Sequence, residues 1–158
     1  MKPEEPVDYN IKEALHAISR MYNTQATQHD ITKSIGFVVL NIDQENGAPA
    51  TKIAPLLGLE TRSLTRILRS MEEKGLIYKQ ADSVDKRSVR IFLTPLGLEK
   101  KEISRQTVRH FNLKIREKIS QAQLDTFFKV AGQITSMIEG KTLFEGFVLR
   151  LLQSEMSA

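Results

Sequence analysis

Hydrophobic residues near the start of the chain recur every three or four positions, which is the spacing of one face of an α-helix. In the first segment Ile11, Leu15 and Ile18 follow this spacing, and Asp8 is a candidate N-cap. A second amphipathic helix is predicted after Asp30, another candidate N-cap, and it ends before a loop that contains a glycine and a proline. The pattern therefore predicts two helices before the first loop.

A short helix, a tight turn and a longer helix are predicted in the middle of the chain. Residues 51–57 have a helical pattern that Gly58 breaks, and Pro55 is tolerated near the end of the first turn. Thr61 is the candidate N-cap of the next helix, which ends where Gly75 suits the left-handed position after a helix. This arrangement is typical of a helix–turn–helix.

Two strands follow, over residues 76–81 and 89–93, and a polar loop joins them. A single hairpin is not stable by itself, so we expect it to pack on the neighbouring helices. Thr94 then caps a long helix that has Pro95 at its first position and that extends to Lys118.

Two further helices are predicted at the end of the chain. Ser120 and Gln123 form a capping-box pair that opens the first of them, Gly140 interrupts it, and Thr142 caps the last. The order of elements predicts a mainly α fold, a winged helix–turn–helix with a two-stranded β-wing and with helices at both ends of the chain.

The charge of the chain is concentrated in this middle region. The 158 residues include 23 Lys and Arg and 19 Asp and Glu, a net charge of +4. Residues 50–90 hold nine basic and five acidic side chains, so they carry the whole excess. A local basic patch on a neutral scaffold is typical of a protein that binds a polyanion, although a solvated charged surface is the alternative.

The helix predicted from Thr61 has two contrasting faces. At about 100° per residue its arginines fall on one side and its large apolar residues on the other. Arginine suits phosphate oxygens and guanine edges because its planar fork donates two parallel hydrogen bonds, and an α-helix fits the major groove. No acidic residue shares the arginine sector before Glu72 and Glu73, so a neutralising ligand explains these charges better than solvation does. The polar face consists of Arg62, Ser63, Thr65, Arg66 and Arg69, and the apolar face of Leu64, Ile67, Leu68 and Met71.

The loop between the two strands is a candidate wing. Lys86 and Arg87 lie near its tip, where a basic side chain can enter the minor groove or reach its phosphates. Asp85 is expected to pair with Arg87 or Arg90, or to accept loop amides, and Arg90 is expected to support the wing.

These segments resemble the MarR family (multiple antibiotic resistance regulators) of winged-helix transcription factors. The wing signature of that family matches Asp85, Arg87, Leu93, Thr94 and Gly97 in register. The stretch 71–77, Met-Glu-Glu-Lys-Gly-Leu-Ile, matches the family pattern at the end of the preceding helix.

The resemblance implies a homodimeric transcriptional regulator, most often a repressor in such families. Each winged helix would bind one half of a near-palindromic double-stranded DNA operator. It also implies a small aromatic or phenolic effector between the dimer helices and the winged helix. His16, Tyr22 and Phe37 lie on elements that could line that pocket, but core packing explains the two aromatics equally well, so the ligand-binding residues stay open.

The C-terminal sequence supports a dimer independently, because it carries more apolar surface than two helices of a small domain can easily bury alone. The apolar residues of this C-terminal surface are Phe127, Phe128, Phe144, Phe147, Leu151 and Leu152.

We expect an N-terminal dimerisation helix in residues 1–30, the DNA-binding region in 31–95, and the long helix with the C-terminal dimerisation helices in 96–158, all in one compact domain.

Several kinds of chemistry are not expected. The chain has no cysteine, which excludes disulfides, thiolate metal sites and thiol-based peroxide sensing. His16, His29 and His110 are scattered, so no zinc site, other metal site or cofactor is predicted. No acid–base pair or phosphate-binding glycine loop appears, and we expect no enzyme activity. Without an apolar run of about 18 residues or a signal peptide, a cytoplasmic protein with no membrane span is expected.

One alternative of a different class remains, a winged-helix module that binds proteins through the same helices and has no specific DNA binding. Salt dependence separates the two readings, because each phosphate contact adds about −0.9 to the log–log slope of affinity against salt.

Overall fold

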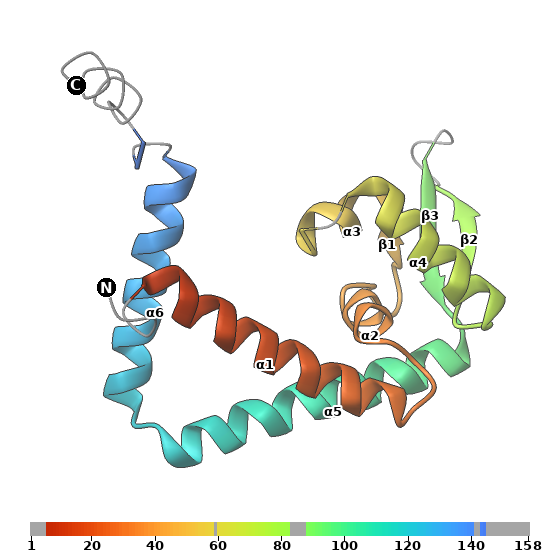
Figure 1. Cartoon of the computed structure of the whole chain (residues 1–158). Coiled ribbons are helices and arrows are strands. Elements are labelled where there is room, and N and C mark those ends of the chain that lie inside the picture. The colour runs from red at the N-terminus through yellow and green to blue at the C-terminus, as the bar shows by residue number, and fades with distance from the viewer. Residues whose placement is uncertain (1–5, 59, 83–87, 141–142, 145–158) are drawn as a thin grey trace. The chain divides into compact units, whose positions relative to one another are not determined.

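The protein is described by a computed structural model that covers residues 6–58, 60–82, 88–140 and 143–144 (Figure 1). It is a mainly α winged helix with a small antiparallel sheet, the fold class that the order of elements predicts. Residues 1–111 and 112–158 form two compact units, which are described separately. The elements are α1 (Val7–Thr27), α2 (Lys33–Leu40), β1 (Ala48–Pro49), α3 (Ala50–Leu56), α4 (Thr61–Glu73), β2 (Ile77–Ala81), β3 (Val89–Leu93), α5 (Pro95–Lys118) and α6 (Gln121–Glu139).

The first two helices begin differently from the prediction. Pro6 is the N-cap residue of α1 and makes no side-chain cap, so Asp8 lies within the first turn, where its charge suits the helix dipole. Asp30 is not the cap of α2, because it takes a left-handed conformation with φ 58° that closes the turn after α1. The side chain of Thr32 caps α2 instead and accepts a hydrogen bond from the Ile35 backbone N–H at 3.2 Å.

The helix–turn–helix is present, with two local corrections. Pro55 lies next to the last residue of α3 rather than in its first turn. The prediction that Thr61 caps α4 is wrong, because Glu60 already has the extended backbone of an N-cap and Thr61 is the first helical residue. The far end of α4 agrees with the prediction, since Gly75 follows it with φ 67°, a conformation that favours glycine.

The wing contains one strand more than predicted. β2 and β3 pair antiparallel from Ile77 opposite Leu93 to Ala81 opposite Val89, as the sequence indicates. The two residues of β1 pair with the other edge of β3, giving the order β1-β3-β2. Because β1 is so short, its sequence carries no alternating pattern that would have revealed it.

The core of the first unit joins α2, α3, α4 and the sheet. The apolar face of α4 supplies Leu64, Leu68 and Met71, all buried. β3 contributes Ile91, which like Met71 has no exposed surface. This packing fixes the direction in which the opposite face of α4 points. The remaining core residues are Ile31, Ile35, Val38, Val39, Ile42, Ala48, Ile53, Ala54, Leu76, Ile77 and Leu93.

Thr94 fastens the start of α5 to the end of α4. Its hydroxyl donates to the Gly75 carbonyl at 2.6 Å and accepts from the Gly97 backbone N–H at 3.1 Å, so the predicted cap is confirmed. Gly97 packs so closely on the preceding turn that a Cβ there would lie 2.0 Å from the Leu76 carbonyl oxygen. The local structure therefore explains why threonine stands at position 94 and glycine at position 97 of the wing signature.

The second unit contains α6, which opens with the predicted capping box of Ser120 and Gln123. Gly140 ends the helix. Of the helix predicted to follow from Thr142, only residues 143–144 are described, and they form a turn, while Phe147 lies outside the described residues. Among the helices of the described residues, none has both the length and the hydrophobicity of a membrane span.

Candidate nucleic-acid interface

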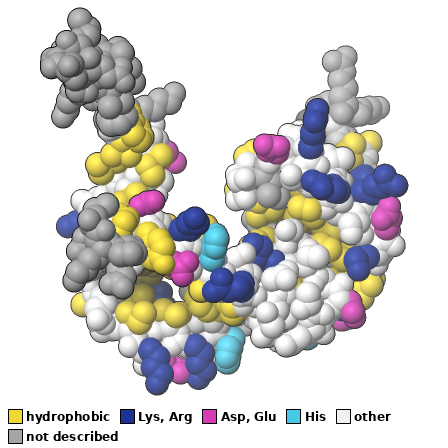
Figure 2. Space-filling model, in the orientation of Figure 1, with side chains coloured by type: hydrophobic (Ala, Val, Ile, Leu, Met, Phe, Trp, Pro, Cys, Tyr) yellow, Lys and Arg dark blue, Asp and Glu magenta, His cyan; other side chains and the backbone are white. Residues whose placement is uncertain are grey.

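The amphipathic division of α4 agrees with the predicted one. Arg62, Thr65, Arg66 and Arg69 are exposed and Ser63 is half-buried, while the apolar face lies in the core. Figure 2 shows Lys and Arg side chains over the lobe that holds α3, α4 and the sheet. The five residues that we selected for the polar face therefore share one accessible side of a rigidly packed helix.

α3 lies beside α4 and forms a groove with it. The groove has a volume of about 360 Å³ and runs along the base of the polar face. The α3 residues Thr51 and Pro55 and the α4 residues Thr61 and Thr65 are among those that line it. The hydroxyl of Thr65 donates to the Thr61 carbonyl at 2.9 Å, so in this state it bonds its own helix.

The arginines of α4 differ in their partners. No described residue forms an ion pair with Arg62 or Arg66. Arg69 does have a partner, Glu73, at 2.9 Å between Nε and Oε1. From the sequence we expected Glu72 and Glu73 to lie apart from the arginine sector, and for Arg69 that is wrong, because Glu73 lies one helical turn away.

The wing is described only at its base. Lys86 and Arg87, together with Asp85, lie outside the described residues, so their roles stay predictions. At the base, the Asp82 backbone N–H donates to the Ser88 carbonyl at 2.9 Å and closes the loop.

Arg90 pairs with Asp82, which was not among its predicted contacts. Its Nε lies 3.4 Å from the Asp82 carboxylate, and only 29% of the Arg90 side chain and 14% of the Asp82 side chain are exposed. Strand register would have indicated this pair, because Arg90 lies opposite Gln80, two residues before Asp82. Arg90 is therefore held at the base of the wing.

A second ion pair joins the end of α4 to the sheet. Lys79 on β2 contacts the carboxylate of Glu72, and both side chains are about half exposed. Neither residue has a role predicted from the sequence. Their pairing depends on the chain reversal at Gly75, which a helical projection of α4 alone does not represent.

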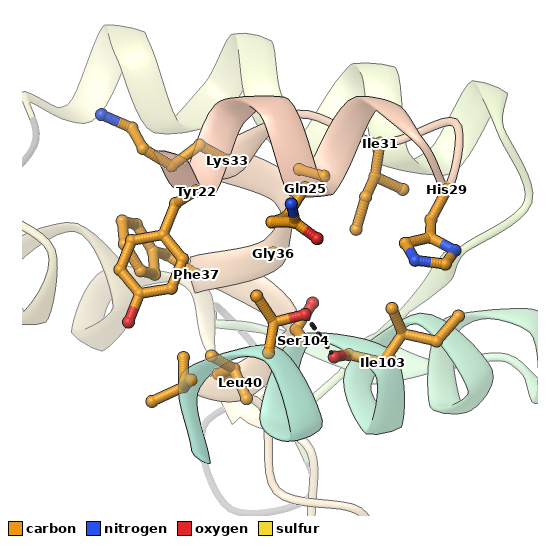
Figure 3. Close-up of a pocket in the computed structure, with 13 residues that line it drawn as sticks. Tyr22, Gln25, His29, Ile31, Lys33, Gly36, Phe37, Leu40, Ile103 and Ser104 are labelled. Carbon is orange, nitrogen blue, oxygen red and sulfur yellow. Dashed lines mark hydrogen bonds between the residues drawn. The ribbon is translucent and has the colours of Figure 1, made fainter. Parts of the chain in front are cut away.

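A narrow cavity of about 30 Å³ lies between α1, α2 and α5, and its residues are drawn in Figure 3. Tyr22 and Phe37 line this cavity, with ring centroids 5.7 Å apart. His16 does not line it, because it lies closer to the N-terminus of α1. Burial raises the pKa of Tyr22. Ser104 is the buried hydroxyl of the cavity wall. Within the described residues, no three His, Asp or Glu side chains are grouped as metal ligands.

The fold and the exposed arginine helix together define a winged helix–turn–helix protein. Residues 26–89 match the model of the MarR family. This match covers less than half of the chain, so the segment that holds the winged helix–turn–helix is similar to the MarR family.

Two curated relatives are transcriptional regulators of the helix–turn–helix type. TtmR of Methylorubrum extorquens is 33% identical over 84 residues, which cover 53% of this chain and 43% of TtmR. YhbI of Bacillus subtilis is 29% identical over 111 residues, covering 70% of this chain and 72% of YhbI. The chain thus spans less than half the length of the first relative and most of the second.

The fold is also that of a solved complex. The MepR protein of S. aureus, in a crystal structure with DNA, superposes with a TM-score of 0.77 over 85% of this chain and 98% of that chain. The identity is 22%, so this likeness establishes the fold alone.

Proposed function

We propose that this protein is a homodimeric transcriptional regulator that binds double-stranded DNA sequence-specifically through α4 and the wing. The observation that carries the proposal is the polar face of α4, where two exposed arginines have no ion-pair partner among the described residues. A packed helix that presents uncompensated guanidinium groups suits the phosphates and base edges of a major groove.

The side chains have distinct proposed roles. Arg62 and Arg66 contact phosphates or guanine edges, and Arg69 does so when its pair with Glu73 opens. Ser63 and Thr65 supply hydroxyls for backbone or bases. On the wing, Lys86 and Arg87 reach the minor groove or its phosphates, and Arg90 holds the wing base through Asp82.

The dimer is supported by apolar surface on two helices. α1 buries none of its residues, and Leu15 is 61% exposed. Figure 2 shows hydrophobic side chains gathered along α6, where Phe127 and Phe128 are 62% and 51% exposed. Contiguous apolar surface of this kind marks a protein interface. A symmetric dimer matches a near-palindrome whose half-sites lie about 34–36 Å apart.

We further propose repression that a small aromatic or phenolic effector relieves. The relevant cavity is the one between α1, α2 and α5, but it has room for little more than a water molecule. A ligand of drug-like size needs roughly 300 Å³. Binding would therefore separate α1, α2 and α5, and because α2 packs on α4, the separation would alter the presentation of α4.

Selection of bound fragments from a random duplex pool tests this function. The expected product is a near-palindrome with half-sites one helical turn apart, bound with a steep salt dependence. Failure to enrich any sequence, with affinity insensitive to salt, would instead favour a module that binds proteins.

A further inference from the structure

The last two residues of α4 are both acidic, and both are used in ion pairs. Glu73 pairs with Arg69 on the same helix, and Glu72 pairs with Lys79 on β2. Both carboxylates lie at the C-terminal end of α4, where the helix dipole disfavours negative charge. The order in which Arg69 precedes Glu73 by four residues is also the less favourable one for a helical pair.

The stability of the free protein therefore does not explain why a glutamate stands at position 73. Its carboxylate and the Arg69 guanidinium are 63% and 80% exposed, and pairs as exposed as this contribute little to folding. Glu73 does have a clear effect on charge, because it neutralises one of the three arginines on the polar face of α4. It also orients the Arg69 side chain towards the end of the helix.

We propose that Glu73 is a specificity-determining residue that restrains Arg69 and so limits binding to arbitrary DNA. This role rests on the proposed function. Affinity for arbitrary duplex depends mainly on how many cations meet phosphates, so a neutralised Arg69 lowers it. On the specific DNA sequence, the Arg69–Glu73 ion pair opens because a phosphate or base edge lies where the Arg69 guanidinium can bind it. Weakening the wrong complexes is a recognised way to gain specificity.

The test compares Glu73→Gln with a matched control, Glu117→Gln, in the full chain. Glu117 is also an exposed acid in an ion pair on one helix, with Lys114 at 2.8 Å, so both variants change the net charge equally. Each protein is titrated by fluorescence anisotropy against a mixed-sequence duplex and against the selected duplex, between 50 and 200 mM salt (about the range over which phosphate contacts change affinity most clearly).

We expect Glu73→Gln to bind the mixed-sequence duplex roughly three- to tenfold more tightly and to steepen the log–log salt slope by about 0.9, the contribution of one phosphate contact. Its discrimination between the two duplexes should fall. The double variant Arg69→Ala with Glu73→Gln should lose the gain, and Glu117→Gln should match the parent.

Two results would overturn the role of Glu73 alone: equal behaviour of the Glu73 and Glu117 variants, or a gain that survives in the double variant. Absence of salt-dependent duplex binding by the parent chain would overturn the proposed function, and this role with it.

Discussion

α4 and α6 are both amphipathic helices, but the large apolar residues of α4 are mostly buried and those of α6 are mostly exposed. In α4 the face with Leu68 and Met71 lies in the core, so the helix presents charge. In α6 only Leu124 is buried, and Phe127 and Met137 are at least half exposed. The difference indicates the kind of partner each helix suits, a polyanion for α4 and another apolar surface for α6.

The largest expected effect is on the free energy of unfolding, and two methionines, one on each helix, test the comparison. Met71→Ala on α4 should lower the free energy of unfolding by about 2–5 kcal/mol, because the removed side chain is fully buried. Met137→Ala on α6 is the matched change at a residue that is 50% exposed, and its effect at low protein concentration should be within about 0.5 kcal/mol. Urea unfolding followed by circular dichroism measures both. Equal losses would show that α6 is already covered within one chain.

A charge placed on the apolar face of α6 should prevent dimerisation. Phe127→Asp would bury a carboxylate in the proposed interface, so we expect self-association to weaken at least about 100-fold. Thr126→Asp introduces the same charge at the adjacent exposed residue and should have little effect. Sedimentation velocity over a concentration series measures the dissociation constant. A dimer that tolerates Phe127→Asp would exclude this face from the interface.

On α4, Arg66→Ala should weaken binding by roughly 1–3 kcal/mol at selected base pairs, and much less where those pairs have been changed. Arg87→Ala on the wing should weaken binding to all sequences and reduce the salt slope by about 0.9. Arg109→Ala, at an exposed arginine of α5, is the control. Competition titrations with single-base variants of the selected duplex distinguish the two patterns. If both arginine variants bind like the parent, the assignment of these surfaces is wrong.

The smallest expected effect concerns the turn before β1. Hydrogen bonds from the backbone N–H groups of Asn46 and Glu45 lower the pKa of Asp43, because they favour the charged carboxylate. A depressed folded pKa gives stability that is present above the unfolded value, near 3.8, and that is lost as pH falls through the folded value. Asp43→Asn should therefore flatten the acid side of the stability profile slightly. Thermal melts at pH 3 to 6 (about the range around a carboxyl pKa) measure it, and an unchanged profile would contradict it.

Periodicity predicted the two faces of α4 correctly because helical spacing is a local property. Thr94 and Gly97 were found in the same way, through a signature of fixed spacing. β1 was missed because two residues show no pattern. The four-residue spacing of Arg69 and Glu73 would also have indicated their ion pair, whereas the Arg90–Asp82 pair depends on the register of β2 and β3, which residue types alone do not give.

The two hydrogen bonds of Thr94 give the molecule a mechanical property. One side chain links the carbonyl just after α4 to the first turn of α5, and Gly97 leaves no space between α5 and the chain at Leu76. A rotation of the start of α5 would thus act directly on the C-terminal end of α4. The connection between the two helices would therefore transmit the rotation over a very short distance.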